Sequence, residues 1–189
     1  MVFEPFPKIA RLKREAVVTE KIDGENMAIK ISDDGCEIQC QSRNQNIYVH
    51  KDVSGFANWV HAHSAELIKQ LGPGIHFGEW WGSGIGRGYG LKEKRFSLFN
   101  VHRWHTESED CKCVEAPLCY VVPTLTRINR FSTEEVDKAL AELKVTGSIA
   151  AKGYNNPEGV VVFHTQNSAL YKVTYEYDVQ GKGRPVVVD

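Results

Sequence analysis

The sequence lacks the features of a membrane or secreted protein. No apolar run approaches the roughly 20 residues that a membrane-spanning helix requires. The opening stretch, Met1-Val2-Phe3-Glu4-Pro5, contains neither the basic region nor the apolar region of a secretory signal. We therefore expect a cytoplasmic protein that does not associate with a membrane.

An excess of charge of one sign is also lacking. The chain has 23 Lys and Arg against 24 Asp and Glu, which gives a formal net charge of −1. A protein of this balance has no overall positive field that would attract polyanions. Any nucleic acid must therefore be held by a local basic patch.

Paired cysteines are lacking as well, because the chain has five, an odd number. Without a secretory signal, this number favours reduced thiols over disulfides. Zinc ligands could in principle come from a cluster of histidines and cysteines, but its C-x-C spacing and single histidines match no standard zinc module. The cluster consists of His102, His105, Cys111, Cys113 and Cys119.

What the chain does contain is the composition of a folded protein. Of its 189 residues, 42% are hydrophobic and 10% aromatic, which excludes a disordered, collagen-like or coiled-coil chain. This length suits one core that buries roughly 70% of the surface of the unfolded chain. We expect a single domain over residues 1–189.

Strand patterns outnumber helix patterns along the chain. Residues 27–31 and 36–41 alternate in polarity around Asp34-Gly35, a pair that favours a tight hairpin turn. Helical spacing predicts one helix within 53–71 and a second that begins after the capping residue Ser132. Further strands are expected at 15–19, 75–81, 96–101, 119–122, 159–163 and 170–174. The class is α+β with largely antiparallel sheets.

Polar motifs adjoin these predicted strands in a fixed order. The first is Glu20-Lys21-Ile22-Asp23-Gly24-Glu25-Asn26, which by itself is typical of a surface turn. The others are Ser42-Arg43-Asn44, Phe77-Gly78-Glu79-Trp80-Trp81-Gly82, Phe96-Ser97-Leu98-Phe99-Asn100-Val101, Glu158-Gly159-Val160-Val161-Val162 and Leu170-Tyr171-Lys172-Val173.

In this order the motifs resemble those of the covalent nucleotidyltransferases, a superfamily of polynucleotide ligases and capping enzymes. The resemblance spans about residues 17–174. It implies the nucleotidyltransferase (ATP-grasp-like) domain, in which helices flank antiparallel β-sheets. Asn26 completes the K-x-x-G-x-N form that is typical of one class of phage and cellular RNA ligases.

The resemblance therefore implies an ATP-dependent RNA ligase, which joins 3′-hydroxyl and 5′-phosphate ends of RNA through a lysyl-AMP intermediate. A nicked or bridged RNA duplex is the expected substrate, and DNA is an alternative. Two residues depart from the motifs of this RNA ligase class, so other functions remain as alternatives. Asp23 is typical of DNA ligases and capping enzymes, and Thr174 stands where a second motif lysine is usual. The alternatives are a minimal DNA ligase, a GTP-using capping-type transferase and a nucleotide-binding remnant that needs a partner.

Three residues carry the expected chemistry. By resemblance, Lys21 forms the bond to AMP, Glu158 binds the metal and Lys172 contacts the α-phosphate. A lysine amine titrates near 10.4, so the nucleophile must be activated by nearby positive charge. Magnesium, for which manganese is an alternative, supplies such charge and takes oxygen ligands.

Five further residues are expected to bind the nucleotide, again by resemblance. Arg43 and Glu79 contact the ribose, and Phe96 stacks on adenine. Asn26 orients the phosphate or its hydrated metal, and the backbone of Glu20 reads the base.

A glycine-rich segment, Gly82 to Gly90, superficially resembles a dinucleotide-binding fingerprint but lacks the helix that should follow. We interpret it as a flexible loop. Its basic residues and those just after it predict a grip on phosphates; they are Arg87, Lys92, Lys94 and Arg95.

The segment after residue 174 is too short for the OB or helical domain that ligases of this superfamily usually add. We expect neither domain here, and a protein partner could supply the strand binding that such a domain provides.

Overall fold

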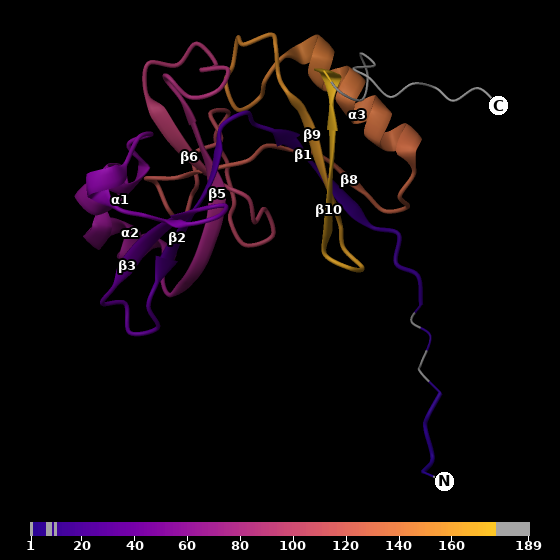
Figure 1. Ribbon diagram of the computed structural model, residues 1–189. Coiled ribbons are helices and arrows are strands. Elements are labelled where there is room, and N and C mark those ends of the chain that lie inside the picture. The colour runs from indigo at the N-terminus through magenta and orange to yellow at the C-terminus, as the bar shows by residue number, and fades with distance from the viewer. Residues whose placement is uncertain (1, 7–8, 10, 177–189) are drawn as a thin grey trace, which may run out of the picture.

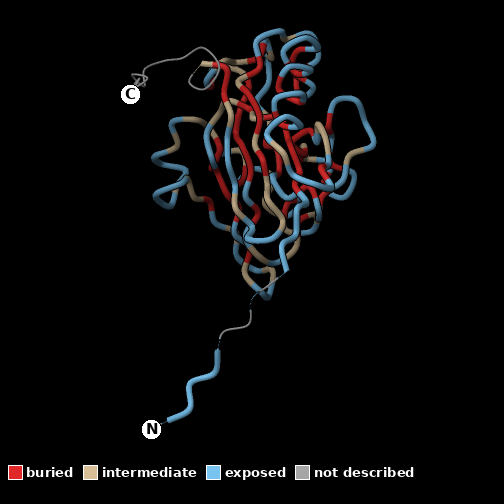
Figure 2. Tube along the Cα trace, turned by 90° about the vertical axis from the view of Figure 1, so that its right-hand side faces the viewer, coloured by how far each residue is buried: buried red, intermediate tan, exposed pale blue. Residues whose placement is uncertain are grey.

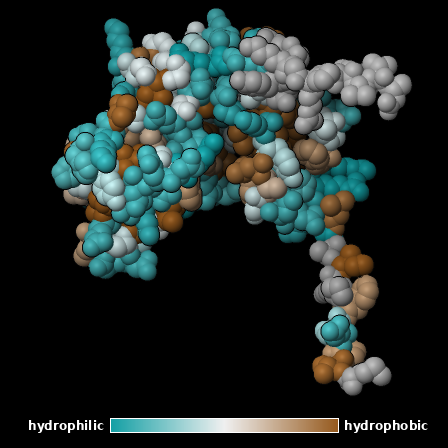
Figure 3. All heavy atoms as spheres, in the orientation of Figure 1, coloured by the Kyte–Doolittle hydropathy of each residue, from teal (hydrophilic) through white to brown (hydrophobic). Residues whose placement is uncertain are grey.

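The computed structural model describes residues 2–6, 9 and 11–176. Two sheets face each other, and the helices lie on their outer sides (Figure 1). The surface is hollowed between the two sheets (Figure 3). This arrangement confirms the expected α+β class with largely antiparallel pairing.

The larger sheet has six strands in the order β4-β3-β2-β5-β6-β7. Each neighbouring pair is antiparallel except β6 and β7, which are parallel. Two helices, α1 (Phe56–Ala62) and α2 (Ser64–Leu71), cover its outer face (Figure 1). The strands are β2 (Glu25–Ile31), β3 (Ile38–Ser42), β4 (Asn46–Ile47), β5 (Gly74–Gly82), β6 (Lys94–Leu98) and β7 (Tyr120–Val121).

The smaller sheet has four antiparallel strands in the order β10-β9-β1-β8. Helix α3 (Thr133–Thr146) packs on its outer face (Figure 1). The strands are β1 (Ala16–Lys21), β8 (Thr124–Ile128), β9 (Gly159–His164) and β10 (Ala169–Thr174).

Strand β1 contributes to two hydrophobic clusters because successive side chains point to opposite faces of a strand. Val17 packs in the cluster of the larger sheet, whereas Ala16 and Val18 pack in the cluster under α3. Buried residues accordingly run through the middle of both sheets (Figure 2). The strand that ends on Lys21 is thus held from both sides.

The hairpin at Asp34-Gly35 and the helix after Ser132 are confirmed. Gly35 has a φ of 68°, and the Ser132 hydroxyl accepts the Glu135 N–H at 3.3 Å. The single helix expected within 53–71 is wrong, because His63 leaves the helical conformation and separates α1 from α2. Its ring Nδ1 contacts the Trp59 carbonyl at 2.8 Å, which holds the break.

Strands β4 and β8 and a short 3₁₀ helix (Val49–Lys51) were not expected from the sequence. Among the described helices, none has the length and apolar character needed to cross a membrane.

Candidate active site

The site is built around an ion pair between the ends of two neighbouring strands. Lys21 is the last residue of β1, and its Nζ lies 2.6 Å from Oε2 of Glu158, which immediately precedes β9. Both side chains are partly exposed, at 22% and 18% of their surface. The structure therefore brings together the predicted nucleophile and the predicted metal ligand.

Two glycines near the ion pair lie where the backbone passes close to a neighbouring strand. Gly24 follows the Lys21 turn, and a Cβ there would lie 2.5 Å from the Trp80 carbonyl oxygen. Gly159 has a φ of 155°, and a Cβ there would lie 2.1 Å from the Val173 carbonyl oxygen. A side chain at Gly24 would therefore clash with β5, and one at Gly159 would clash with β10, because real Cβ atoms do not come so close to backbone oxygens.

Beside the ion pair, three predicted nucleotide-binding side chains form a hydrogen-bond chain. Asn26 Nδ2 donates to Glu79 Oε2 at 2.7 Å, and Arg43 Nη2 donates to Asn26 Oδ1 at 3.2 Å. Together with Lys21, these residues line a hollow of about 550 Å³. Its wall also includes Lys51, Asp52 and Ser54, which sequence reasoning did not single out.

Glu79 is the buried member of this chain. Burial raises the pKa of its carboxyl to about 7, although Lys21 and the hydrogen bond from Asn26 act in the opposite direction. At neutral pH the group is therefore divided between its protonated and ionised forms. A protonated carboxyl can donate a hydrogen bond as well as accept one.

Lys172 lies on the same face of the smaller sheet as Lys21. Across β1, β9 and β10, the register places Lys21, Gly159 and Thr174 in one row. It places Thr19, Val161 and Lys172 in another row, two residues along the strands. Two strand spacings and two residues separate the two lysines, which corresponds to roughly 12 Å between their backbones. Lys172 is exposed, and within the described residues its side chain makes no ion pair, so the lysine is free to reach a ligand above Lys21.

Phe96 does not lie in the site. Its side chain is 0% exposed, and its ring packs against Phe56 with centroids 5.1 Å apart, on the face covered by α1. The predicted stacking on adenine does not fit this position. The physical reason is strand alternation, since Ser97 pairs with Glu79 on the site face and Phe96 therefore points away from it.

Phe99, which belongs to the same motif as Phe96, does share the face of Glu79. Its N–H donates to the Phe77 carbonyl at 3.0 Å, and this pair lies two residues along the strands from the pair of Glu79 and Ser97. Its side chain is 39% exposed and that of Phe77 is 54% exposed. Phe96 and Phe99 are three residues apart in one motif, so the alternation of side chains along a strand could have shown that they point to opposite faces.

Glu20 is buried, and its side chain has a role that the sequence did not indicate. The carboxylate accepts hydrogen bonds from the Ser148 hydroxyl and from the N–H groups of Ile149 and Ala150, at 2.6, 2.9 and 3.0 Å. Burial nevertheless raises the pKa of this carboxyl. The backbone N–H of Glu20 donates to the Pro123 carbonyl and is therefore already engaged. Recognition of the base by the backbone carbonyl of Glu20 stays a prediction.

The segment from Gly82 to Gly90 is not the flexible loop expected from its glycines. Successive turns are closed by the hydrogen bonds of Ile85 to Gly82 and of Gly88 to Ile85, and Tyr89 is buried. The glycines supply the positive φ angles of these turns rather than flexibility.

The basic residues of this region are also largely engaged. Arg87 pairs with Asp23 and Glu176, and Lys94 donates to the Ser54 carbonyl. Arg95 pairs with Glu93 and stacks on the Tyr120 ring. Among the basic side chains of the described residues 82–95, only that of Lys92 has no ion pair, hydrogen bond or ring contact. The predicted binding of phosphates by these residues therefore does not fit this arrangement.

Two members of the cysteine and histidine cluster contact the same carboxylate. The ring of His105 and the thiol of Cys113 both contact Glu115, at 2.7 and 3.5 Å. Cys111, Cys113 and Cys119 are buried thiols.

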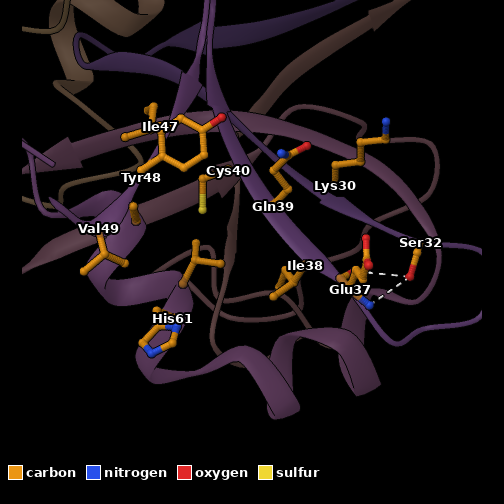
Figure 4. A pocket seen from close by; sticks show the side chains of 12 residues that line it. Lys30, Ser32, Glu37, Ile38, Gln39, Cys40, Ile47, Tyr48, Val49 and His61 are labelled. Atoms are coloured by element: carbon orange, nitrogen blue, oxygen red, sulfur yellow. Dashed lines mark hydrogen bonds between the residues drawn. The ribbon is translucent and has the colours of Figure 1, made fainter. Parts of the chain in front are cut away.

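A second hollow, of about 590 Å³, is slightly larger than the one beside Lys21. It lies between β3 and α1, where Cys40, Ile47, Tyr48, Val49 and His61 line it (Figure 4). It contains none of the predicted site residues, so size does not identify the reactive centre.

The comparison with protein families decides the relationship of the chain. The model of the RNA ligase family matches residues 14–174. The chain belongs to the RNA ligase family. The matched range contains every residue of the site described above, from Glu20 to Lys172. A comparison with curated protein sequences gives no match.

Solved structures of an RNA ligase from Naegleria gruberi share the fold. An E227A mutant with ATP and Mn has a TM-score of 0.60 at 19% identity, covering 86% of this chain and 50% of that one. The same enzyme with PPi has a TM-score of 0.58 at 18% identity, covering 91% and 53%. An E312A mutant with AMP and Mn has a TM-score of 0.57 at 20% identity, covering 86% and 50%. The chain spans about half the length of these relatives.

Proposed function

We propose that the chain is an ATP-dependent RNA ligase that acts through AMP bound to Lys21 and joins RNA 3′-hydroxyl and 5′-phosphate ends. The contact of Lys21 with Glu158 is the observation that carries this proposal, because it sets a nucleophile that lines the hollow of about 550 Å³ beside a carboxylate. Membership of the RNA ligase family supports the same reaction.

In the first step the Lys21 nitrogen attacks the α-phosphorus of ATP. A nitrogen–phosphorus bond forms, the bond from the α-phosphorus to the bridging oxygen of the β-phosphate breaks, and pyrophosphate leaves. Solvent water takes up the proton that the amine loses. An ammonium paired with Glu158 is not a nucleophile, so Glu158 must release it before the attack. Lys172, on the same face, can bind the α-phosphate as Lys21 approaches it.

The donor set at Glu158 fits a magnesium or manganese ion that arrives with the nucleotide. One carboxylate oxygen faces Lys21, and the side chain remains partly exposed. No group of three or more histidine, cysteine, aspartate or glutamate residues in the described part of the chain is arranged to hold a metal. Magnesium commonly binds one or two carboxylates together with substrate phosphates, and there it would neutralise the charge on the transferring phosphate.

The base and sugar would occupy the face of the larger sheet. Phe99 and Phe77 offer exposed rings one row from Glu79, about 7 Å along the strand. Glu79, Asn26 and Arg43 then lie between the rings and the phosphates, where they can bind the ribose and the α-phosphate.

Adenylylation can be tested by incubating the chain with ATP labelled at the α- or the γ-phosphate, or with α-labelled GTP, in magnesium or manganese. Denaturing electrophoresis should show label from α-labelled ATP only. Mass spectrometry should place AMP on Lys21. Label from GTP would favour a capping-type transferase, and no label at all would favour a nucleotide-binding remnant.

The second and third steps transfer AMP to a 5′-phosphate and then release it as the 3′-hydroxyl attacks. We propose a nicked or bridged RNA duplex as substrate, and cytoplasmic RNA ends as its source. Matched RNA and DNA nicks test this directly, because equal sealing of both would favour the DNA ligase alternative. If the chain forms enzyme-AMP but seals only with an added protein, a partner supplies the strand binding.

A further inference from the structure

The glycine-rich loop folds over the turn that follows the candidate nucleophile. Asp23 N–H donates to the Tyr89 hydroxyl at 2.8 Å, and Arg87 N–H donates to Asp23 Oδ2 at 3.1 Å. A Cβ at Gly86 would lie 2.8 Å from the Asp23 carbonyl oxygen. The loop therefore fixes Asp23, two residues after Lys21, by contacts to both its backbone and its side chain.

Tyr89 is also in contact with the segment that leads to Glu158. Its ring centroid lies 4.7 Å from that of Tyr154 and 4.9 Å from that of Trp81. Tyr154 precedes Glu158 by four residues. One side chain thus touches the turn after Lys21 through its hydroxyl and the approach to Glu158 through its ring.

The backbone of Tyr89 is held in an unfavourable conformation. Its φ is 52°, in the left-handed region that disfavours residues with a side chain, and it lies between Gly88 and Gly90. Conformations of this kind persist where the surrounding structure imposes them, often at functional sites. Tyr89 is almost fully buried, with an exposure of 3%. Burial raises the pKa of its phenol, so the hydroxyl stays neutral.

We propose that Tyr89 is a positioning residue for adenylylation, which sets the place of Lys21 relative to Glu158. This inference rests on the proposed function. The hydroxyl holds the turn after Lys21, and the ring holds the segment before Glu158. Small errors in the placement of reacting groups can lower a rate by up to about 100-fold.

The test removes only the hydroxyl, with Tyr89→Phe. The matched control is Tyr175→Phe, which removes another buried hydroxyl, one that donates to the Leu140 carbonyl beneath α3. The measurement is the single-turnover rate of AMP transfer to the protein over a range of ATP concentrations, together with the melting temperature.

We expect Tyr89→Phe to lower the maximal rate at least about tenfold while the half-saturating ATP concentration stays within about twofold of wild type. Tyr175→Phe should keep the wild-type rate and melt at or below the temperature of Tyr89→Phe. A wild-type rate for Tyr89→Phe, an equal loss in Tyr175→Phe, or a change in half-saturation alone would overturn the proposal.

A second pair of variants tests the placement of the turn after Lys21 without changing Tyr89. Gly86→Ala places a methyl group against Asp23, whereas Gly84→Ala, also at positive φ, meets nothing within 4 Å. The backbone strain is similar in both, so a larger loss of maximal rate in Gly86→Ala supports the proposal and equal losses contradict it. If wild-type protein forms no adduct, the proposed function fails instead.

Discussion

The two sheets contribute different kinds of side chain to the site. The smaller sheet provides partly or fully exposed charges at the ends and edges of strands, namely Lys21, Glu158 and Lys172. The larger sheet provides a hydrogen-bond chain that ends on the buried Glu79. The charged groups nearest the proposed reaction therefore lie on one sheet, and the hydrogen-bonded groups lie on the other. Substitutions on each side should differ in kind as well as in size.

The largest effect is expected on the smaller sheet, from Lys21→Ala. Removal of the nucleophile should reduce the adduct with AMP to background while the protein stays folded, because this strand-end side chain is partly exposed. Electrophoresis with labelled ATP measures the loss. The control is Lys69→Ala, an exposed lysine on α2. An undiminished adduct, or AMP on another lysine, would refute the assignment.

Glu158 should give the next largest effect. We expect Glu158→Ala and Glu158→Gln both to slow adduct formation by about 100-fold or more, because magnesium requires a charged oxygen ligand. A magnesium titration of the adenylylation rate measures this, with Glu66→Gln on α2 as control. Full activity of Glu158→Gln across the titration would move the metal role elsewhere.

The two phenylalanines of one motif should separate stability from activity. Phe96→Ala removes a fully buried ring and should cost about 3–5 kcal/mol of unfolding free energy. Phe99→Ala should cost under about 1.5 kcal/mol, since the ring is already partly exposed, but should raise the half-saturating ATP concentration. Urea unfolding and ATP titration check both. If Phe99→Ala leaves the ATP dependence unchanged, the base does not bind on this face.

The smallest effect is a pH dependence from the larger sheet. The pKa of Glu79 is raised by burial to about 7 from an ordinary value of 4.5, so the folded protein holds a proton that the unfolded chain releases between these values. The contribution of Glu79 to stability is therefore full below pH 4.5 and is lost as the pH rises through 7. Relative to Glu79→Gln, wild-type protein should lose on the order of 1–3 kcal/mol of unfolding free energy between pH 5 and 8. Parallel pH profiles for the two proteins would show that Glu79 is ionised throughout.

Local pattern was sufficient to predict the fold class, the hairpin at Asp34-Gly35 and helix α3, because each depends on residues close together in the chain. The break at His63 was not predictable in this way, since apolar spacing continues through it and only the packing of α1 and α2 separates them. Motif order identified Lys21 and Glu158, which the structure brings into contact. The motif predicted Phe96 in the site, because it specifies a residue type and not the face to which that residue points.

The basic residues around the glycine-rich loop show the other limit of sequence reasoning. Arg87 and Arg95 are neutralised by Asp23, Glu176 and Glu93, and two of these partners lie far from them in the sequence. A run of basic residues in the sequence therefore does not by itself define a positive surface. Pairing across the fold decides which charges remain free to bind phosphate.

The shared position of strand β1 has a consequence for how the protein loses activity. Its side chains anchor two hydrophobic clusters at once, through Val17 on one side and Ala16 and Val18 on the other. Partial unfolding that melts either cluster would release the strand that ends on Lys21. Loss of adenylylation in denaturant should therefore follow whichever cluster opens first. The backbone amides of β1 should therefore begin to exchange with solvent in the same partial opening event.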